Sequence, residues 1–472
     1  MYAIQGEEHI LDEYQLADFW SMPAARREVV LREAIAAAHA WHYQHNRAYR
    51  ATVAARGVDG HPAAVAEPGA LGRLLRPTAQ TFKSYIDVLG TPFPQDRPAE
   101  FLAWLDDQLS VDLAPGRQNG FRPRYRSLEA LLQAVEAAWT GRGFQVLTSS
   151  GTSGRSTILV RNGEATARTV DSFYQSFCRY LGVEGIQRAI FVMPRRTRIA
   201  MAQMAAFSVS RLDLPADHVH FTIPFPAEPD QVRIRAGRTF RPGLGGWVEQ
   251  RLGYPFMNWM QARFVTPRAV RASLDLLRRA EAGGERVLLF AGYVQLHAIA
   301  QALQAEGQTL HLAPGSLLGT GGGLKELYPF SPDQIRADVA AVIRDSDGAP
   351  LPVRDVYGMA EANWAAMQCA RGNYHLPPWV YARTLDEDDA VQEGGDSTGL
   401  LAFFDPYGGG RLFPAFFKTA DQVRLVRPAA ESPRLEVAPE LACPCGEPGA
   451  YIAAGSIRRV DLLDEAGCAA QV

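Results

Sequence analysis

The sequence predicts an α/β protein with a largely parallel central sheet, followed by a β-rich part. From residue 144 onward, short apolar runs alternate with segments of helical periodicity, which is typical of parallel strands joined by helices. In chain order, these segments are 189–193 (strand), 267–282 (helix), 287–291 (strand) and 294–305 (helix). From about residue 394 the sequence becomes rich in turns and short strands, for example at 399–404, 422–426 and 450–453.

The part before residue 144 is predicted to be mainly helical. Residues 24–56 carry Val29, Ala36 and His39 on one helical face with few helix-breaking residues. Residues 127–139 form a second amphipathic pattern with leucines on one side. The stretch at 88–142 is irregular in its first half.

The composition is that of an ordinary soluble globular protein. Of 472 residues, 47% are hydrophobic and 21% charged, and the net charge of −3 provides no basic surface for nucleic acid. No apolar run approaches the roughly 18 residues that would span a bilayer, so we expect no membrane partner. The N-terminus lacks the pattern of a signal peptide, and the expected location is cytoplasmic.

A loop of glycines and hydroxyl residues at 148–157 lies between two predicted strands, at 145–147 and 157–160. Such a loop can direct several backbone N–H groups and hydroxyls to one point, which suits a phosphate chain. It does not fit the Walker pattern, which needs four residues between its glycines and then Gly-Lys-Ser/Thr. A plain Ser/Gly turn in a hairpin is the alternative. The central residues of the loop are Ser150, Gly151, Thr152, Ser153 and Gly154.

This loop resembles the phosphate-binding loop of the adenylate-forming superfamily, which contains acyl- and aryl-CoA ligases and adenylation domains of peptide synthetases. Three further segments resemble motifs of that superfamily. They are the glycine strand Gly321, Gly322, Gly323, Leu324 and Lys325, the Tyr357-Gly358-Met359-Ala360-Glu361 segment, and Lys418-Thr419-Ala420-Asp421. Several motifs spread over about 300 residues make the resemblance specific.

The resemblance implies a role for each motif. Tyr357, next to Gly358, would stack on adenine, and Glu361 would hold the Mg²⁺ ion that bridges the phosphates of ATP. The threonine of the superfamily motif is Ala360 here, so one phosphate contact is missing. Asp421 would hold both ribose hydroxyls, since a carboxylate can accept two hydrogen bonds at once. Taken alone, Asp421 would read as a solvated turn residue.

Residues 455–461 resemble the hinge that precedes the small C-terminal domain of the superfamily, with Arg459 in a nucleotide-binding position. The sequence ends eleven residues after Asp461, and no lysine follows Lys418. The resemblance therefore implies the large N-terminal domain without the C-terminal lid domain. Any cation that assists adenylation would come from the large domain or from a partner.

The shortened end points to the acyl-protein synthetases of bacterial bioluminescence, the LuxE-like proteins, and to related truncated ligases of secondary metabolism. Thr157 stands near the place where many members of the superfamily carry a lysine, and in this the chain resembles phenylacetate-CoA ligase-like proteins. Thr81-Phe82-Lys83 and the Ala466-Gly467-Cys468 segment are local matches. In LuxE-like enzymes a cysteine near the end accepts the acyl group, and Cys468 resembles it. An incidental cysteine on a terminal tail is the alternative.

The implied architecture has two packed α/β subdomains and a β-rich, barrel-like subdomain. Compared with the LuxE-like family, the stretch at 88–142 is longer, and the resemblance implies an insertion there. The expected divisions are 1–143 (helical region with this insertion), 144–393 (adenylate-binding core), 394–455 (β-rich subdomain) and 456–472 (truncated hinge and tail).

Four residues predict a structural zinc site. Cys443 and Cys445 form a tight chelating turn, and Cys369 with His375 gives a Cys-x5-His pair. Three sulfurs and one nitrogen complete a tetrahedral site and leave no open position for substrate. The alternative is that Cys369 is a small buried hydrophobe and His375 a surface residue.

The expected function is ATP-dependent activation of a carboxylic acid as an acyl-adenylate, followed by transfer to a thiol, with Lys325, Glu361 and Cys468 as catalytic residues. The alternatives are an AMP-forming acyl- or aryl-CoA ligase, an amide-forming ligase, and an inactive adenylate-binding protein. The expected partners are the acid and an acyl reductase or carrier protein, with a homodimer left open. Phe256, Trp259, Met260 and Phe264 have helical spacing, which favours core positions over an acyl pocket.

Overall fold

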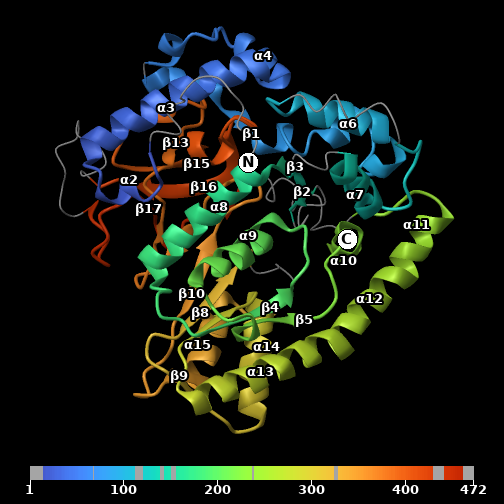
Figure 1. The fold of residues 1–472 in the computed structure, drawn as a ribbon, viewed down its shortest axis with the longest axis vertical. Helices are drawn as coiled ribbons and strands as arrows, with labels where there is room; N and C mark the ends of the chain where they lie inside the picture. Colours follow the sequence, from blue (N-terminus) through green and yellow to red (C-terminus); the bar gives the residue numbers. More distant parts are fainter. Residues whose placement is uncertain are drawn as a thin grey trace.

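The computed structural model describes residues 14–66, 68–111, 121–138, 143–149, 156–236, 239–323, 328–428 and 441–460. Its main feature is one 14-stranded sheet, in the order β14-β13-β15-β16-β17-β12-β11-β10-β8-β6-β4-β5, with β1 and β18 paired to β16. Helices cover both faces of its parallel part (Figure 1). The predicted α/β class is therefore confirmed.

The parallel half consists of five strands, and a hydrophobic cluster packs against each of its faces. Its strands are β5 (Val219–Ile223), β4 (Arg188–Pro194), β6 (Val287–Phe290), β8 (Leu317–Gly321) and β10 (Val353–Tyr357). Because side chains alternate along a strand, Ile190 joins one hydrophobic cluster and Phe191 the other. The helices of one cluster are α13 (Thr266–Gly283), α14 (Tyr293–Ala305) and α15 (Pro332–Val342), and those of the other include α8 (Gly163–Ser176) and α9 (Ala200–Val209).

The antiparallel half continues the same sheet, because β10 turns back into β11 and pairs with it antiparallel. Its strands are β11 (Ala366–Gln368), β12 (Tyr374–His375), β17 (Tyr451–Ile452), β16 (Phe416–Val426), β15 (Asp396–Phe404), β13 (Tyr381–Leu385) and β14 (Val391–Gln392). The predicted β-rich part thus shares a sheet with the parallel core, and the proposed domain boundaries stay predictions.

The N-terminal helices form as expected, with one interruption. Residues 24–56 give α3 (Ala24–His45) and α4 (Arg47–Ala54), which are separated at Asn46. The Asn46 backbone is extended, and its side chain accepts a hydrogen bond from the Tyr49 N–H at 2.7 Å, which caps α4. The predicted helix at 127–139 is α7 (Leu128–Ala138), and β2 (Gln145–Thr148) pairs antiparallel with β3 (Ile158–Arg161).

A long helical rod precedes and includes α13, and its first half is exposed. It begins with α11 (Leu244–Val248) and continues through the π-helical turn η9 (Glu249–Gly253), α12 (Tyr254–Met260) and the π-helical turn η10 (Gln261–Val265). The expectation of core positions on α12 and η10 is wrong: Phe256 and Trp259 are 58% and 53% exposed, and Met260 and Phe264 are also exposed. Helical spacing identified the apolar stripe but not whether anything covers it.

The remaining elements are short. They are α2 (Asp18–Ser21), β1 (Arg76–Pro77), α5 (Tyr85–Leu89), α6 (Pro98–Asp107), α10 (Pro229–Ala236), β7 (Leu310–Leu312), β9 (Ile343–Asp345), α16 (Pro406–Gly409) and β18 (Arg458–Arg459), besides single turns of 3₁₀ helix and the π-helical turn at Phe177–Leu181. Among the described residues, every helix is too short or too polar to cross a bilayer.

Candidate active site

The two ends of the glycine loop are held together where β2 ends and β3 begins. The Ser149 N–H donates to the Thr157 carbonyl at 3.1 Å, and the Thr157 N–H donates to Ser149 Oγ at 2.9 Å. The loop therefore starts and ends at a closed hairpin neck. Its central residues lie outside the described residues, among them Ser150, Gly151, Thr152, Ser153 and Gly154.

Glu361 lies directly beside this neck. The Thr157 hydroxyl donates to Glu361 Oε1 at 2.7 Å, and Lys83 Nζ lies 3.9 Å from the same oxygen. Glu361 is 3% exposed, so its carboxylate is largely removed from bulk water while still paired with a cation. The structure thus joins a residue at the end of the loop with the expected Mg²⁺ ligand, although the two are about 200 residues apart in the chain.

Lys83 reaches this position because its neighbours are tied to the same strand. The Ile158 N–H donates to the Phe82 carbonyl at 3.0 Å, and the Tyr85 hydroxyl donates to the Ser156 carbonyl at 3.2 Å. The segment around Lys83 therefore lies along the end of the glycine loop. The sequence identified Lys83 only as part of a short family match, and its position beside Glu361 became visible only in the structure.

Arg161 holds the turn that carries Glu361. It is fully buried, donates through Nε to Asn363 Oδ1 at 3.0 Å, and donates through Nη2 to the carbonyls of Ala360 and Ala362. Burial lowers the pKa of Arg161 to about 10, so the side chain stays charged at neutral pH. Sequence reasoning missed this residue, because no local pattern distinguishes a buried arginine at the end of a strand from an exposed one.

Tyr357 and Asp421 meet at the end of β10. The Tyr357 hydroxyl donates to Asp421 Oδ2 at 2.7 Å. Burial, with the adjacent carboxylate, raises the pKa of Tyr357 well above its usual value, so the phenol keeps its proton. Arg459 on β18 pairs with Asp421 in the sheet register, and its Nε lies 3.9 Å from Asp421 Oδ1. The expected adenine and ribose contacts therefore lie side by side.

The glycine strand runs parallel to β10, with Gly321 in register with Val356. Gly322 and Gly323 have φ values of +84° and +68°, a left-handed backbone that glycine adopts without strain. The chain thus turns sharply just beyond the end of β8, next to the strand that carries Tyr357. Lys325 and Cys468, two of the three expected catalytic residues, lie outside the described residues.

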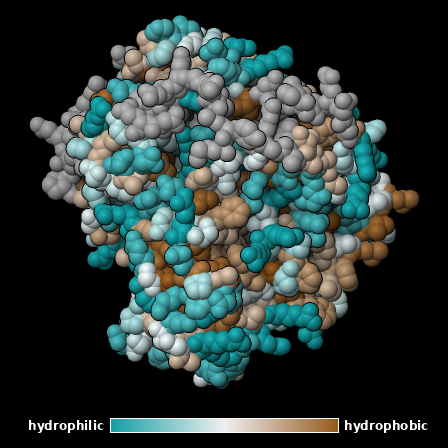
Figure 2. Space-filling view, in the orientation of Figure 1, coloured by the Kyte–Doolittle hydropathy of each residue, from teal (hydrophilic) through white to brown (hydrophobic). Residues whose placement is uncertain are grey.

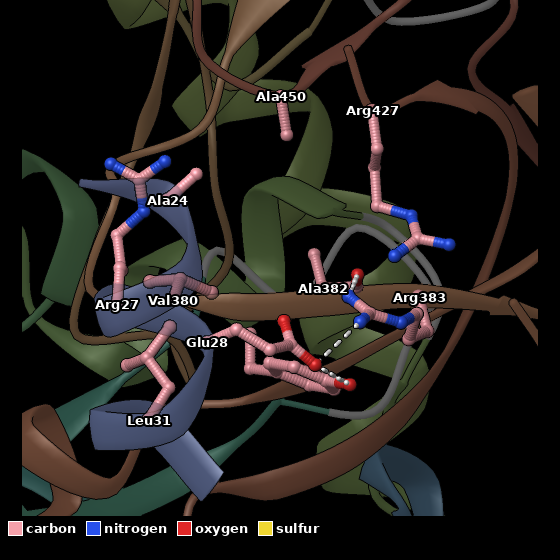
Figure 3. A pocket seen from close by; sticks show the side chains of 10 residues that line it. Ala24, Arg27, Glu28, Leu31, Val380, Ala382, Arg383, Arg427 and Ala450 are labelled. Carbon is pink, nitrogen blue, oxygen red and sulfur yellow. Dashed lines mark hydrogen bonds and ion pairs between the residues drawn. The ribbon is translucent and has the colours of Figure 1, made fainter. Parts of the chain in front are cut away.

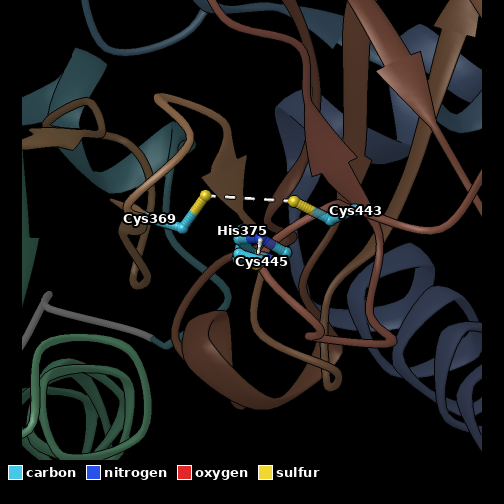
Figure 4. A group of neighbouring side chains, drawn as sticks. All are labelled: Cys369, His375, Cys443 and Cys445. Atoms are coloured by element: carbon cyan, nitrogen blue, oxygen red, sulfur yellow. Dashed lines mark hydrogen bonds between the residues drawn. The ribbon is translucent and has the colours of Figure 1, made fainter.

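The four predicted metal ligands come together at one place (Figure 4). The ligand atoms of Cys369, His375, Cys443 and Cys445 all lie within 4.8 Å of one another. Cys369 Sγ is 3.9 Å from Cys443 Sγ, and Cys445 Sγ is 3.2 Å from His375 Nε2. A tetrahedral zinc ion with Zn–S bonds of about 2.3 Å would hold two sulfurs about 3.8 Å apart. The separation of Cys369 and Cys443 fits that geometry.

Hydrogen-bond donors surround two of these sulfurs. Asn373 Nδ2 donates to Cys443 Sγ at 3.2 Å, and the Arg371 N–H donates to Cys369 Sγ at 3.4 Å. Asn373 is itself oriented by the Ala454 N–H, which donates to its Oδ1 at 2.9 Å. Burial lowers the pKa of His375 to about 4, so its imidazole is neutral near pH 7, the form that binds metal.

A small pocket lies elsewhere, between α3 and β13 (Figure 3). Its lining includes Arg27, Glu28, Arg383 and Arg427, and Glu28 accepts a hydrogen bond from the Tyr381 hydroxyl at 3.0 Å and pairs with Arg383 at 3.5 Å. None of the predicted site residues lines this pocket. Arg27 donates to the Phe19 carbonyl and Arg427 to the carbonyls of Glu393 and Gly394, so we interpret the pocket as structural.

Solved structures with a similar fold are adenylate-forming ligases. A solved 2-hydroxyisobutyryl-CoA ligase, in an open conformation with 2-HIB-AMP and CoA, superimposes with a TM-score of 0.52 at 14% identity, covering 91% of this chain and 74% of the ligase. The same ligase in its postadenylation state gives a TM-score of 0.51 at 13% identity, covering 93% and 69%. This chain therefore has the fold of an adenylate-forming ligase.

The sequence comparisons identify a family within the adenylate-forming ligases to which part of the chain is similar. Residues 261–472 match the family model described as "Acyl-protein synthetase, LuxE". Two relatives named long-chain-fatty-acid–luciferin-component ligase are similar: that of Aliivibrio fischeri is 29% identical over 152 residues, and that of Vibrio harveyi is 24% identical over 156 residues. The alignments span 32% and 33% of this chain but only 35% and 40% of the relatives. Residues 261–472 are thus LuxE-like, in agreement with the resemblance recognised from the motifs.

Proposed function

We propose that this protein activates a carboxylic acid with ATP as an acyl-adenylate and then transfers the acyl group to a thiol. The observation that carries the proposal is the contact of Glu361 with both Thr157, at the neck of the glycine loop, and Lys83. Four residues before Glu361, Tyr357 contacts Asp421. The residues that we propose for phosphate binding and for sugar binding thereby meet on the one short segment 357–361.

In the first step, a carboxylate oxygen of the acid attacks the α-phosphate of ATP. The bond from that phosphorus to the bridging oxygen breaks, and pyrophosphate leaves. When bound, Mg²⁺ would neutralise charge on the phosphates, and Glu361 is the residue that would hold it. The chain itself holds the two anions together and supplies Lys83 as a fixed positive charge beside the loop.

In the second step, a thiolate attacks the acyl carbonyl, and AMP leaves with its phosphate oxygen. We propose Cys468 or a thiol of a partner, such as an acyl reductase or carrier protein, as the acceptor. Release to CoA or to an amine is the alternative, and replacement of Cys468 by serine separates these cases. If Cys468→Ser still turns over fully with a soluble thiol, Cys468 is not the acyl carrier.

ATP–pyrophosphate exchange with a panel of carboxylic acids tests the proposal. The panel includes long-chain fatty acids, because the names of both curated relatives contain that substrate, together with aryl and hydroxylated aryl acids. We expect acid-dependent and Mg²⁺-dependent exchange with at least one class. Nucleotide binding without exchange for any acid would support the inactive adenylate-binding alternative instead.

We also propose that Cys369, His375, Cys443 and Cys445 hold a structural Zn²⁺ ion. The donor set, the sulfur separation and the neutral imidazole all fit zinc, and the four ligands come from β12 and from loops near β11 and β17. A zinc ion there would tie together the part of the sheet where the parallel and antiparallel halves meet. It would take no part in the chemistry, because four protein ligands leave no open position.

Metal analysis of the purified protein is expected to give one zinc per chain. Cys443→Ser is expected to lose the metal and to lower the thermal midpoint by on the order of 5–10 °C, because metal binding contributes directly to folding free energy. Cys178→Ser is the matched control: burial raises the pKa of this thiol to about 11, and it lies outside the cluster. Wild-type protein without zinc, or equal zinc in the Cys443 variant, would refute the site.

A further inference from the structure

The exposed half of the long helical rod carries an apolar row with unusual regularity. Leu244, Val248, Leu252, Phe256, Met260 and Phe264 follow one another at intervals of four residues, and all six are exposed, from 36% to 85%. Trp247 and Trp259 flank the row and are each more than half exposed. We call these eight side chains the apolar seam. Figure 2 shows brown surface along the edge of the molecule where α11 and α12 lie.

The π-helical turns make the seam straight. In an α-helix of 3.6 residues per turn, residues four apart drift steadily around the axis. Here the Tyr254 N–H donates to the Glu249 carbonyl and the Thr266 N–H to the Gln261 carbonyl, both spanning five residues. A π turn contains about 4.4 residues, so alternating α and π turns average about 4.0 residues per turn. Residues at intervals of four therefore line up parallel to the rod for roughly 30 Å.

The rod is fixed to the body of the protein on its other side, so its exposure is not that of a loose segment. Glu249 pairs with Arg233 of α10 at 2.8 Å. Just before the rod, Arg241 pairs with Asp96 at 2.5 Å and stacks over Phe93 at 4.7 Å. The seam is thus presented outward by a braced helix.

We propose that the apolar seam is the contact surface of a homodimer, in which two rods pack side by side and antiparallel across a two-fold axis. The inference is independent of the catalytic proposal. Eight large side chains of about 200 Å², each roughly half exposed, offer on the order of 800 Å² per copy, which is the area that one partner contributes to a standard stable interface. A straight seam lets two identical helices meet along their whole length without supercoiling.

The charges near the seam favour the antiparallel orientation. Residues 244–265 contain three charged side chains, namely Glu249 near one end and Arg251 and Arg263 further along. In a parallel pair, Arg251 and Arg263 of one rod would each lie beside the same arginine of the other rod, and like charges would repel. An antiparallel pair places the arginines of the two copies apart from one another and opposes the two helix dipoles. So few basic residues also distinguish the rod from a membrane-surface helix, whose polar face is rich in lysine and arginine.

The test uses the full chain and Phe256, which lies close to the middle of the seam. Wild-type protein is expected to have the mass of a dimer in sedimentation velocity at about 50 µM, whereas Phe256→Glu and Phe256→Arg are each expected to be monomers. Mixing the two variants should restore a dimer, because opposite charges then face each other near the axis. Val88→Glu, a substitution at an exposed valine outside the rod, should leave the dimer intact.

Circular dichroism and the thermal midpoint establish that each variant is folded. A monomeric wild-type protein, a dimer that survives Phe256→Glu, or a mixture of the two variants that stays monomeric would each overturn the proposal. So would a monomer that binds vesicles of anionic phospholipid through the rod, since that result would assign the seam to a membrane surface.

Discussion

Glu361→Gln is expected to lower the rate of ATP–pyrophosphate exchange by about 10²- to 10³-fold, the size of effect that follows the loss of one preorganised group that stabilises a transition state. The amide keeps the shape of the side chain and can still accept the 2.7 Å hydrogen bond from Thr157. What it loses is the negative charge that would hold Mg²⁺. The exchange rate should therefore recover in part at high Mg²⁺ concentration.

Glu306→Gln is the control for this substitution, because it removes the same charge from an exposed ion pair with Arg278 on the surface. Its exchange rate should equal that of the wild type. If Glu361→Gln retains exchange within about two-fold of the wild type while both variants stay folded, Glu361 does not serve the nucleotide.

Lys83→Ala is expected to lower kcat/KM for adenylation by about 10²-fold, because Lys83 Nζ lies 3.9 Å from Glu361 Oε1, beside the neck of the glycine loop. Lys83→Arg keeps the charge and should retain much more activity. The effect should be confined to the first step, so transfer from a preformed acyl-adenylate to a thiol should proceed at close to the wild-type rate. Single-turnover measurements of the two half-reactions separate these cases.

A purely structural role of Lys83 would give a different result. If the side chain only neutralised Glu361, its loss would lower the thermal midpoint, and higher Mg²⁺ concentrations would restore full activity. Arg47→Ala, which removes an exposed positive charge paired with Asp107 at 3.8 Å, is the control for a general change in charge. Equal losses in both half-reactions would contradict a role in adenylation.

Most of the fold could be predicted because its elements are long and have a strong period. The apolar runs at β4 and β6 are largely buried. Uninterrupted apolar runs between amphipathic helices are typical of strands in a parallel sheet that is covered on both faces. The break between α3 and α4 comes from a local cap, in which Asn46 accepts from the Tyr49 N–H, and the apolar period of residues 24–56 does not reveal it. The exposure of Phe256 could not be predicted either, since periodicity reports which residues share a face and not what covers it.

Some residues of the candidate site could be predicted from the sequence, and others could be found only in the structure. Tyr357, Glu361 and Asp421 lie in short motifs with a recognisable order, so the sequence could identify them. Lys83 and Arg161 act across distances of 278 and about 200 residues from the Glu361 turn, and no local pattern encodes such contacts. The four metal ligands are an intermediate case. The sequence showed two close pairs of ligands, and only the structure shows that the two pairs lie at one place.

Transfer of an oxygen atom tests the central chemical claim most directly. With an acid that supports exchange, labelled with ¹⁸O in its carboxylate, one turnover through an acyl-adenylate must leave one carboxylate oxygen on the phosphate of AMP. The predicted result is AMP that carries a single ¹⁸O, together with unlabelled pyrophosphate. Formation of ADP, or unlabelled AMP alongside the acylated thiol, would contradict attack of the carboxylate on the α-phosphate and with it the proposed function.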